Sequence, residues 1–225
     1  MRPALIALLL AVPLAAHASE ESEERQLAPF HAVDTSGGIH VVASAAPTQK
    51  VEVHGSASDR ADLVTEVKDG VLELSWKTHF GFTTHSGVSV VVAVPKLDRV
   101  EASGGASAKV TGLPLERAEA SGGGSIEATD QKGKLKLELS GGASATVSGP
   151  GVDNLAIEGS GGADVHAFGL PARAVSVEGS GGGRFEVAAT EALAVTASGG
   201  AKVVVQGHPS AVTQNVSGGG SVVFK

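Results

Sequence analysis

The stretch LELSGGASATV, residues 137–147, is one of seven similar stretches that follow one another after residue 96. Each stretch contains the triplet Ser-Gly-Gly, and the triplets recur at intervals of 18 to 20 residues. The serines that open them are Ser103, Ser121, Ser140, Ser160, Ser180, Ser198 and Ser217. A period of this regularity is typical of a repeat architecture in which each unit stacks on its neighbours.

Apolar and polar residues alternate on both sides of each triplet. Apolar residues stand three and one positions before the serine, and again five and seven positions after it. In the quoted stretch these residues are Leu137, Leu139, Ala145 and Val147. Alternation with a period of two indicates a β-strand with one buried face. Each repeat is therefore predicted to be a strand, a Ser-Gly-Gly bend, a second strand and a second turn.

The repeat length selects one fold among the β architectures. About 19 residues per repeat are too few for a βαβ unit and too regular for the loops of a sandwich. The sequence therefore predicts an all-β, right-handed parallel β-helix, in which equivalent residues of successive coils lie about 4.8 Å apart. The bends are then expected to stack in one column, with glycine's special dihedral angles at positions such as Gly142 and Gly162.

The first 18 residues are predicted to be a signal peptide rather than part of the fold. Arg2 precedes an apolar run that ends at Ala16-His17-Ala18, which matches the small-x-small cleavage rule. This run is shorter than the roughly 20 residues that span a bilayer, so an anchoring helix is disfavoured. Residues 19–27 follow as an acidic tail that we expect to be disordered. The mature chain is then exported to the periplasm, the cell surface or the extracellular space.

Charge and cysteine content exclude several classes of function. Without Arg2, the chain carries 24 acidic residues against 16 basic ones, so it lacks the basic surface of a nucleic-acid-binding protein. It contains no cysteine, which excludes disulfides, thiolate nucleophiles and thiolate metal sites. We expect no cofactor and no transmembrane span in the mature chain, and the oligomeric state stays open.

Residues 28–225 are predicted to form a single domain in two parts. Residues 96–225 hold the repeats, and residues 28–95 form an irregular β-rich region that covers the N-terminal end of the solenoid. In this region Ser36-Gly37-Gly38 opens a degenerate coil, and a hairpin turn is expected at Lys68-Asp69-Gly70. The expected strands are 50–54, 63–68, 71–76 and 88–94.

Several of these motifs together carry a resemblance to a known family. The turn Val94-Pro95-Lys96-Leu97 leads into the first Ser-Gly-Gly repeat, and Gly207-His208-Pro209 precedes the last one. Over residues 28–223 the chain resembles the head GIN domain of auto-transporter adhesins, although the family usually shows Gly-Ser-Gly where this chain has Ser-Gly-Gly. The resemblance implies an exported bacterial β-helix protein, an adhesin-like binding module of the cell envelope, and no shared catalytic residues.

A row of glutamates is the first candidate for a binding surface. Two residues before the serine, five consecutive coils carry Glu101, Glu119, Glu138, Glu158 and Glu178. In the β-helix these carboxylates are predicted to form an outward-facing ladder, and Arg99, Arg117 and Lys136 are placed to offset the first three. We interpret the ladder as a solvated, partly paired face. Glu158 and Glu178, expected to be unpaired, are the candidate ligands for a divalent cation or a cationic partner.

The aromatic residues are the second candidate. Trp76, Phe80 and Phe82 form the only aromatic cluster of the chain. They either cap the core or provide the contact for a glycan or another envelope protein, because aromatic side chains are favoured interface anchors.

Enzymatic activity is the alternative, since parallel β-helices also include polysaccharide lyases and hydrolases. Such a site would combine acids with bases. The candidates within three coils are Glu158, Glu178, Asp164, Arg173, Arg184 and Lys202. However, the repeats lack the long insertions that form a substrate cleft, so we predict no catalytic residues. A structural envelope protein without a ligand is the third interpretation.

Overall fold

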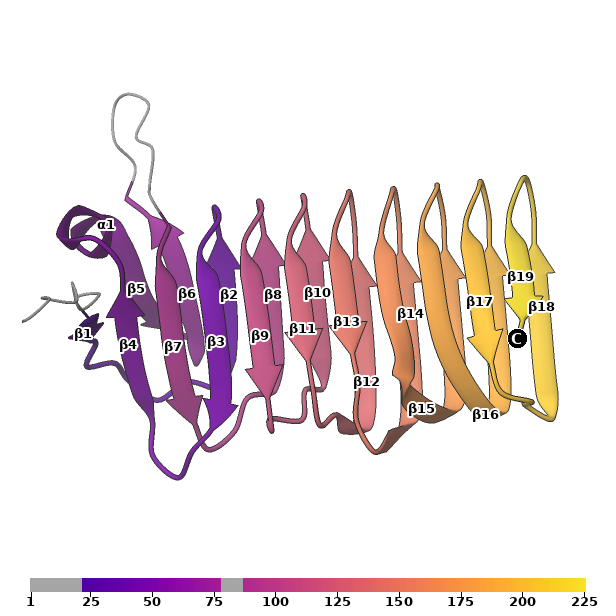
Figure 1. Cartoon of the computed structure of the whole chain (residues 1–225), viewed down its shortest axis with the longest axis horizontal. Helices are drawn as coiled ribbons and strands as arrows, with labels where there is room; N and C mark the ends of the chain where they lie inside the picture. The colour runs from indigo at the N-terminus through magenta and orange to yellow at the C-terminus, as the bar shows by residue number, and fades with distance from the viewer. Residues whose placement is uncertain (1–21, 78–86) are drawn as a thin grey trace, which may run out of the picture.

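The computed structural model describes residues 22–77 and 87–225, which form a long solenoid of β-strands (Figure 1). Each Ser-Gly-Gly bend joins two strands that belong to two different faces of the solenoid. In Figure 1 the strands before the bends run upward at the back, those after the bends run downward in front, and successive coils advance to the right. The winding is therefore right-handed, and the predicted parallel β-helix is confirmed.

The strands before the bends form what we call the glutamate sheet. They are β8 (Arg99–Ser103), β10 (Arg117–Ser121), β12 (Lys132–Leu139), β14 (Gly151–Gly159), β15 (Asp164–Gly179), β16 (Arg184–Ala197) and β18 (Ala211–Val216). The strands after the bends form the opposite sheet. They are β9 (Ser107–Thr111), β11 (Ser125–Ala128), β13 (Ser144–Val147), the first halves of β15 and β16, β17 (Lys202–Gln206) and β19 (Ser221–Phe224). β15 and β16 belong to both sheets because they continue around the second corner.

The Ser-Gly-Gly bends stack in one column, as predicted. Ser121 pairs with Ser103 in register, and the amide of Gly162 donates to the carbonyl of Gly141 at 2.7 Å. The position of the backbone constraint differs from the expectation at Gly142 and Gly162. The first glycine of each triplet has the positive φ, for example 68° at Gly141 and 71° at Gly161. From Ser140 onward the second glycine is not in this region, so the first glycine makes the bend.

The core is a narrow column of small and branched apolar side chains between the two sheets. The predicted inward positions are buried in the repeats up to the coil of Ser198, including Val100, Leu137 and Val177. Gln131, which lies in the second turn of its repeat, is also fully buried. Its side chain accepts from the amide of Leu115 at 2.8 Å and donates to the carbonyl of Leu113 at 3.0 Å. This glutamine therefore satisfies backbone groups of the neighbouring second turn.

Order along the solenoid differs from order along the sequence in the N-terminal region. β2 (Ala32–Ser36) and β3 (His40–Ala45) form the predicted degenerate coil, which stacks directly on the Ser103 coil through the pair Ser36 and Ser103. β6 (Val71–Trp76) and β7 (Ser89–Val94) stack in parallel on its other side. The chain thus builds one coil, then the coil outside it, and returns to continue the solenoid.

Antiparallel strands close the N-terminal end. β5 (Leu63–Lys68) pairs with β6 through the predicted hairpin, where Asp69 and Gly70 have φ of 50° and 77°. β4 (Lys50–His54) pairs antiparallel with β7, and the short helix α1 (Ala57–Asp62) connects β4 to β5.

One stretch of the expected disordered tail is a strand. β1 (Ser22–Glu24) pairs antiparallel with β4, so the tail 19–27 differs from the expectation over these residues. The amide of Arg25 donates to the carbonyl of Val51 at 2.9 Å and continues this pairing. Within the described ranges, no helix has the length and apolar character needed to cross a membrane.

Candidate functional site

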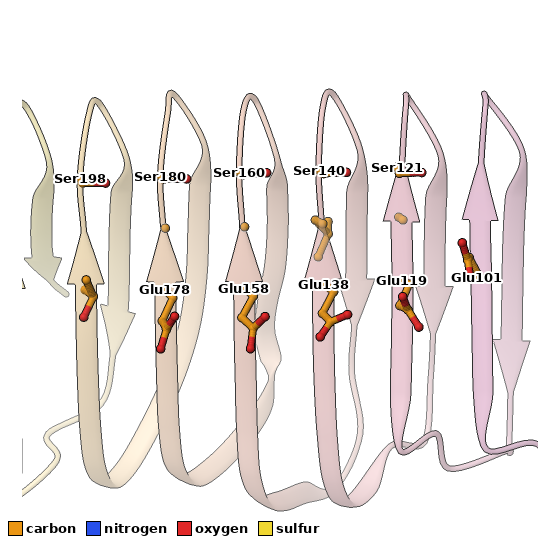
Figure 2. A pocket seen from close by; sticks show the side chains of 15 residues that line it. Glu101, Glu119, Ser121, Glu138, Ser140, Glu158, Ser160, Glu178, Ser180 and Ser198 are labelled. Carbon is orange, nitrogen blue, oxygen red and sulfur yellow. The ribbon is translucent and has the colours of Figure 1, made fainter.

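The glutamate ladder exists as predicted and is longer than the repeats indicated. Strand register places Glu101, Glu119, Glu138, Glu158 and Glu178 side by side on adjacent strands. Figure 2 shows these side chains in a row across the strands, below the row of serines. Thr196 continues the row after Glu178.

Three acidic residues of the N-terminal region extend the ladder. Asp34 pairs in register with Glu101, Glu73 with Asp34, and Glu66 with Glu73. Asp34 stands two residues before Ser36, as each glutamate stands before its serine, so the repeat pattern could have revealed it. Glu73 and Glu66 follow only from the out-of-order stacking of β6 and β5.

Basic side chains neutralise the middle of the ladder by bridging neighbouring strands. Arg117 Nε lies 2.8 Å from Glu119 Oε1, and the same guanidinium also bonds Glu138 on the next strand. Lys136 Nζ lies 2.5 Å from Glu138 Oε1 and 2.7 Å from Glu158 Oε1. Each of these bases therefore forms ion pairs with a glutamate on its own strand and with one on the following strand.

The two candidate ligand residues, Glu158 and Glu178, differ in their pairing with basic side chains. Glu158 was expected to be unpaired, but Lys136 reaches it from the preceding strand, so this expectation is wrong. Glu178 has no cationic partner among the residues that the structure describes, and its side chain is exposed. The same described residues hold no group of three His, Cys, Asp or Glu side chains arranged for a metal ion.

The pKa values of the ladder carboxyls change along the solenoid. Burial raises the pKa of Asp34, and the neighbouring charge of Glu73 raises it further, against the opposing effect of Arg99. Burial, with the charges of Asp34 and Glu119, also raises the pKa of Glu101. By contrast, the hydrogen bond from Lys136 lowers the pKa of Glu138. The N-terminal part of the ladder therefore holds protons more tightly than the middle.

A shallow groove of about 590 Å³ runs along the ladder. Its lining contains all five glutamates of the repeats and the serines that begin five of the bends, and no basic residue. Figure 2 shows the serines Ser121, Ser140, Ser160, Ser180 and Ser198 along its upper side. The groove crosses successive strands, so it offers carboxylates and hydroxyls at the repeat distance of a β-sheet.

A second recess of about 370 Å³ lies on the C-terminal half of the same sheet. Its lining is mostly apolar and comes from small outward-facing side chains and the backbone between them. The outward-facing residues are Asn154, Ala156, Ala174, Ser176, Ala192, Ala194, Ala211 and Thr213. Ala156 and Ser176 stand two residues before Glu158 and Glu178, so the recess adjoins the ladder.

The residues that an enzymatic site would need are not brought together. Glu158 and Glu178 lie on the glutamate sheet, whereas Asp164, Arg184 and Lys202 lie on the opposite sheet. Arg173 Nε pairs with Glu191 Oε1 at 3.0 Å, away from the ladder. The predicted bends could have separated these residues, because Glu158 and Glu178 precede a Ser-Gly-Gly triplet whereas Asp164, Arg184 and Lys202 follow one.

The opposite sheet carries a separate charged cluster. His166 Nδ1 lies 2.9 Å from Glu186 Oε2, and Arg184 Nη2 lies 2.6 Å from Glu186 Oε1. The hydrogen bond with His166 and the one from Arg184 lower the pKa of Glu186. Asp164 Oδ2 lies 3.6 Å from His166 Nε2. These contacts connect acidic and basic side chains on the outward face of the opposite sheet.

Trp76 is held in the fold at the end of β6. Its indole Nε1 donates to the carbonyl of Gly37 at 2.7 Å, and the ring packs against the core. The other two members of the aromatic cluster, Phe80 and Phe82, lie outside the described residues. The contacts of Trp76 agree with the capping interpretation for this residue.

Comparison with solved structures identifies the same solenoid in proteins of low sequence identity. A protein described as a "putative adhesin", from Bacteroides fragilis NCTC 9343, superposes with a TM-score of 0.81 at 18% identity, over 91% of this chain and 96% of that one. A second protein with this description, from Parabacteroides distasonis ATCC 8503, gives a TM-score of 0.72 at 20% identity with the same coverage. A protein of that strain described as lipid binding gives 0.69 at 18% identity, again over 91% and 96%. These likenesses show the fold.

Family membership comes from the sequence match. None of the curated proteins matches the chain. The family model described as "Putative auto-transporter adhesin, head GIN domain" matches residues 29–209 and so spans most of the fold. This chain therefore belongs to the head GIN domain family of auto-transporter adhesins.

Proposed function

We propose that the chain is an exported, non-catalytic, adhesin-like binding module of the cell envelope or extracellular space, and that the glutamate sheet is its binding face. Family membership supports the adhesin-like role. The solved neighbours are described as adhesins or as a lipid-binding protein, which are also binding roles. The arrangement of acids and bases supports binding over catalysis, because the candidate catalytic residues lie on opposite faces.

The observation that carries this proposal is the groove along the ladder. It is an extended surface rather than a closed pocket, and a glutamate recurs on five successive strands that it crosses, from Glu101 to Glu178. Regularly spaced acceptors suit an extended partner, such as a glycan or an envelope protein, that makes similar contacts on successive coils.

A binding panel tests the proposal against the aromatic alternative. Wild type is compared with a Glu158→Gln, Glu178→Gln variant of the face and with a Phe80→Ser, Phe82→Ser variant, on a panel of glycans and envelope proteins. We expect the face variant to bind less and the aromatic variant to bind like wild type, with circular dichroism confirming that both fold. Loss of binding in the aromatic variant alone would move the site to residues 76–82. A folded wild type that binds nothing on the panel would favour the structural role.

Export is tested separately on cells that produce the full chain. We expect the protein outside the cytoplasm, with Ser19 as its first residue after cleavage at Ala18. Fractionation followed by N-terminal sequencing gives both results. Retention of residues 1–18 on a cytoplasmic protein would contradict the proposed localisation.

A further inference from the structure

The alternation of acid and base on the glutamate sheet stops halfway along the solenoid. On β8, β10 and β12, a basic residue stands two positions before the glutamate. On the next three strands the same position holds a small residue, in the order Ala156, Ser176 and Ala194. This change leaves Glu178 without a cationic partner among the described residues, and it removes the long side chains that would fill the second recess.

Lys136 shows the contact that a basic residue makes at this position of the sheet. Its ammonium lies between Glu138 on its own strand and Glu158 on the next, at 2.5 and 2.7 Å. Ala156 is the register neighbour of Lys136 on β14. A base at position 156 would therefore lie between Glu158 and Glu178 in the same way. The position is occupied by a methyl group, and both carboxylates are exposed.

The recess beside these carboxylates suits the remainder of a basic side chain. Its lining is mostly apolar, with alanines on four adjacent strands. Lysine and arginine place their methylene stems along apolar surface while the charged end stays at a polar edge. In the adjoining groove, Arg117 and Lys136 pair with Glu119, Glu138 and Glu158, whereas Glu178 has no basic partner among the described residues. The uncompensated negative charge beside the recess is therefore complementary to such a ligand.

We propose that this recess binds a lysine or arginine side chain from an extended basic segment of a partner protein. The stem lies on Ala156, Ala174 and Ala194, and the charged end lies between Glu158 and Glu178. The inference rests on the proposed function, because it specifies the ligand of the same face. It adds to the proposed function the position of the contact, a comparable contact within the chain at Lys136, and the chemical class of the partner.

The experiment measures binding of a labelled hexalysine peptide to the folded protein by fluorescence anisotropy. We expect wild type to bind, with weaker binding at high salt. Glu178→Gln should weaken binding about two- to fivefold, the range for one exposed ion pair. Ala156→Lys should weaken it more than about tenfold, because a covalent cation then fills the recess and pairs with both glutamates. Matched controls on the opposite sheet are Glu127→Gln and Ser144→Lys, which change the net charge equally and should leave binding unchanged.

Any other outcome contradicts the proposed binding of a basic side chain in the recess. Equal weakening in the controls would show attraction to net charge alone. Unchanged binding in a folded Ala156→Lys variant would show that the recess is not used. If hexalysine does not bind but the panel yields a ligand that depends on the glutamate sheet, this inference is wrong and the proposed function stands. If neither hexalysine nor any panel ligand binds, both are wrong.

Discussion

Phe185 is the largest fully buried side chain among the residues that the structure describes, and three glycines surround its ring. A Cβ atom on Gly179 would lie 2.7 Å from Phe185 Cε2, closer than such atoms approach, and Gly159 and Gly183 face the same ring. At the position of Gly159 and Gly179, other coils carry larger residues such as Ala120. Gly159 and Gly179 therefore provide space for one large side chain, whereas a Cβ atom on Gly183 would also lie 2.7 Å from the carbonyl oxygen of Ala163.

We expect Gly179→Ala to lower the free energy of unfolding by about 1 to 3 kcal/mol, because the added methyl group overpacks the core. Phe185→Leu should also destabilise the domain, since it leaves a cavity. In the double variant the methyl group enters the space that the ring vacated, so its destabilisation should be smaller than the sum of the two. Urea denaturation of the three variants measures this coupling. Strict additivity of the two changes in unfolding free energy would show that the ring of Phe185 is not the reason for a glycine at position 179.

Thr35 is a buried residue whose hydroxyl has no hydrogen-bond partner among the residues that the structure describes. It occupies the inward position of β2, in register with Ala102. We expect Thr35→Val to raise the free energy of unfolding by about 1 kcal/mol, because valine keeps the shape and removes an unsatisfied polar group. The control is Thr111→Val at an exposed position, which should change little. A loss of stability in Thr35→Val would indicate that the hydroxyl is satisfied in solution.

Among the elements, the bends and the strands of the repeats could be predicted from the sequence, and so could the strands of the N-terminal region. Alternation reveals a strand wherever one face is buried, and β4, β5 and β6 have the expected limits. Which glycine makes the bend could not be predicted, because both glycines of a triplet look alike in sequence. The buried Gln131 was also missed, since a glutamine in a turn gives no sign of facing inward.

The two glycines of one bend provide a direct test of this point. Gly161 has φ of 71° and a Cβ atom there would lie 3.0 Å from the carbonyl oxygen of Gly141, whereas for Gly162 the corresponding distance is 3.6 Å. We expect Gly161→Ala to destabilise the domain by about 1 to 3 kcal/mol, through an unfavourable φ and a close backbone contact. Gly162→Ala should cost less than about 0.5 kcal/mol. Thermal unfolding of both variants measures the two losses of stability. Equal losses would contradict the assignment of the bend to the first glycine.

At the scale of the whole molecule, the stacking order decides how long the acidic ladder is. The repeats predict their own order, because each coil follows the previous one in sequence and in space. The N-terminal coil of β6 and β7 stacks outside β2 and β3, an arrangement that depends on long-range pairing and leaves no local signal. The ladder therefore runs on from Glu101 through Asp34 to Glu73 and Glu66, whereas the sequence indicated only its C-terminal part.

This ladder should respond to pH in opposite senses at its two parts. The pKa of Asp34 is raised from 3.8, mainly by burial, so the folded state binds its proton more tightly than the unfolded state does. Its ionisation therefore costs stability as the pH rises through the raised value. The pKa of Glu138 is lowered from 4.5 by Lys136, so its contribution is present at neutral pH and is lost as the pH falls through the lowered value.

We accordingly expect Asp34→Asn to raise the melting temperature at neutral pH and Glu138→Gln to lower it. Both differences from wild type should shrink as the pH is lowered from about 7 to about 3, because protonation removes the charge that each substitution removes. Both variants replace one ladder carboxylate by its amide, so each is the control for the other, and calorimetric scans at several pH values measure the effect. Changes of the same sign would mean that total charge governs stability. Opposite signs that merge in acid would show that the ladder is divided, with Asp34 destabilised by burial and Glu138 stabilised by its bridging lysine.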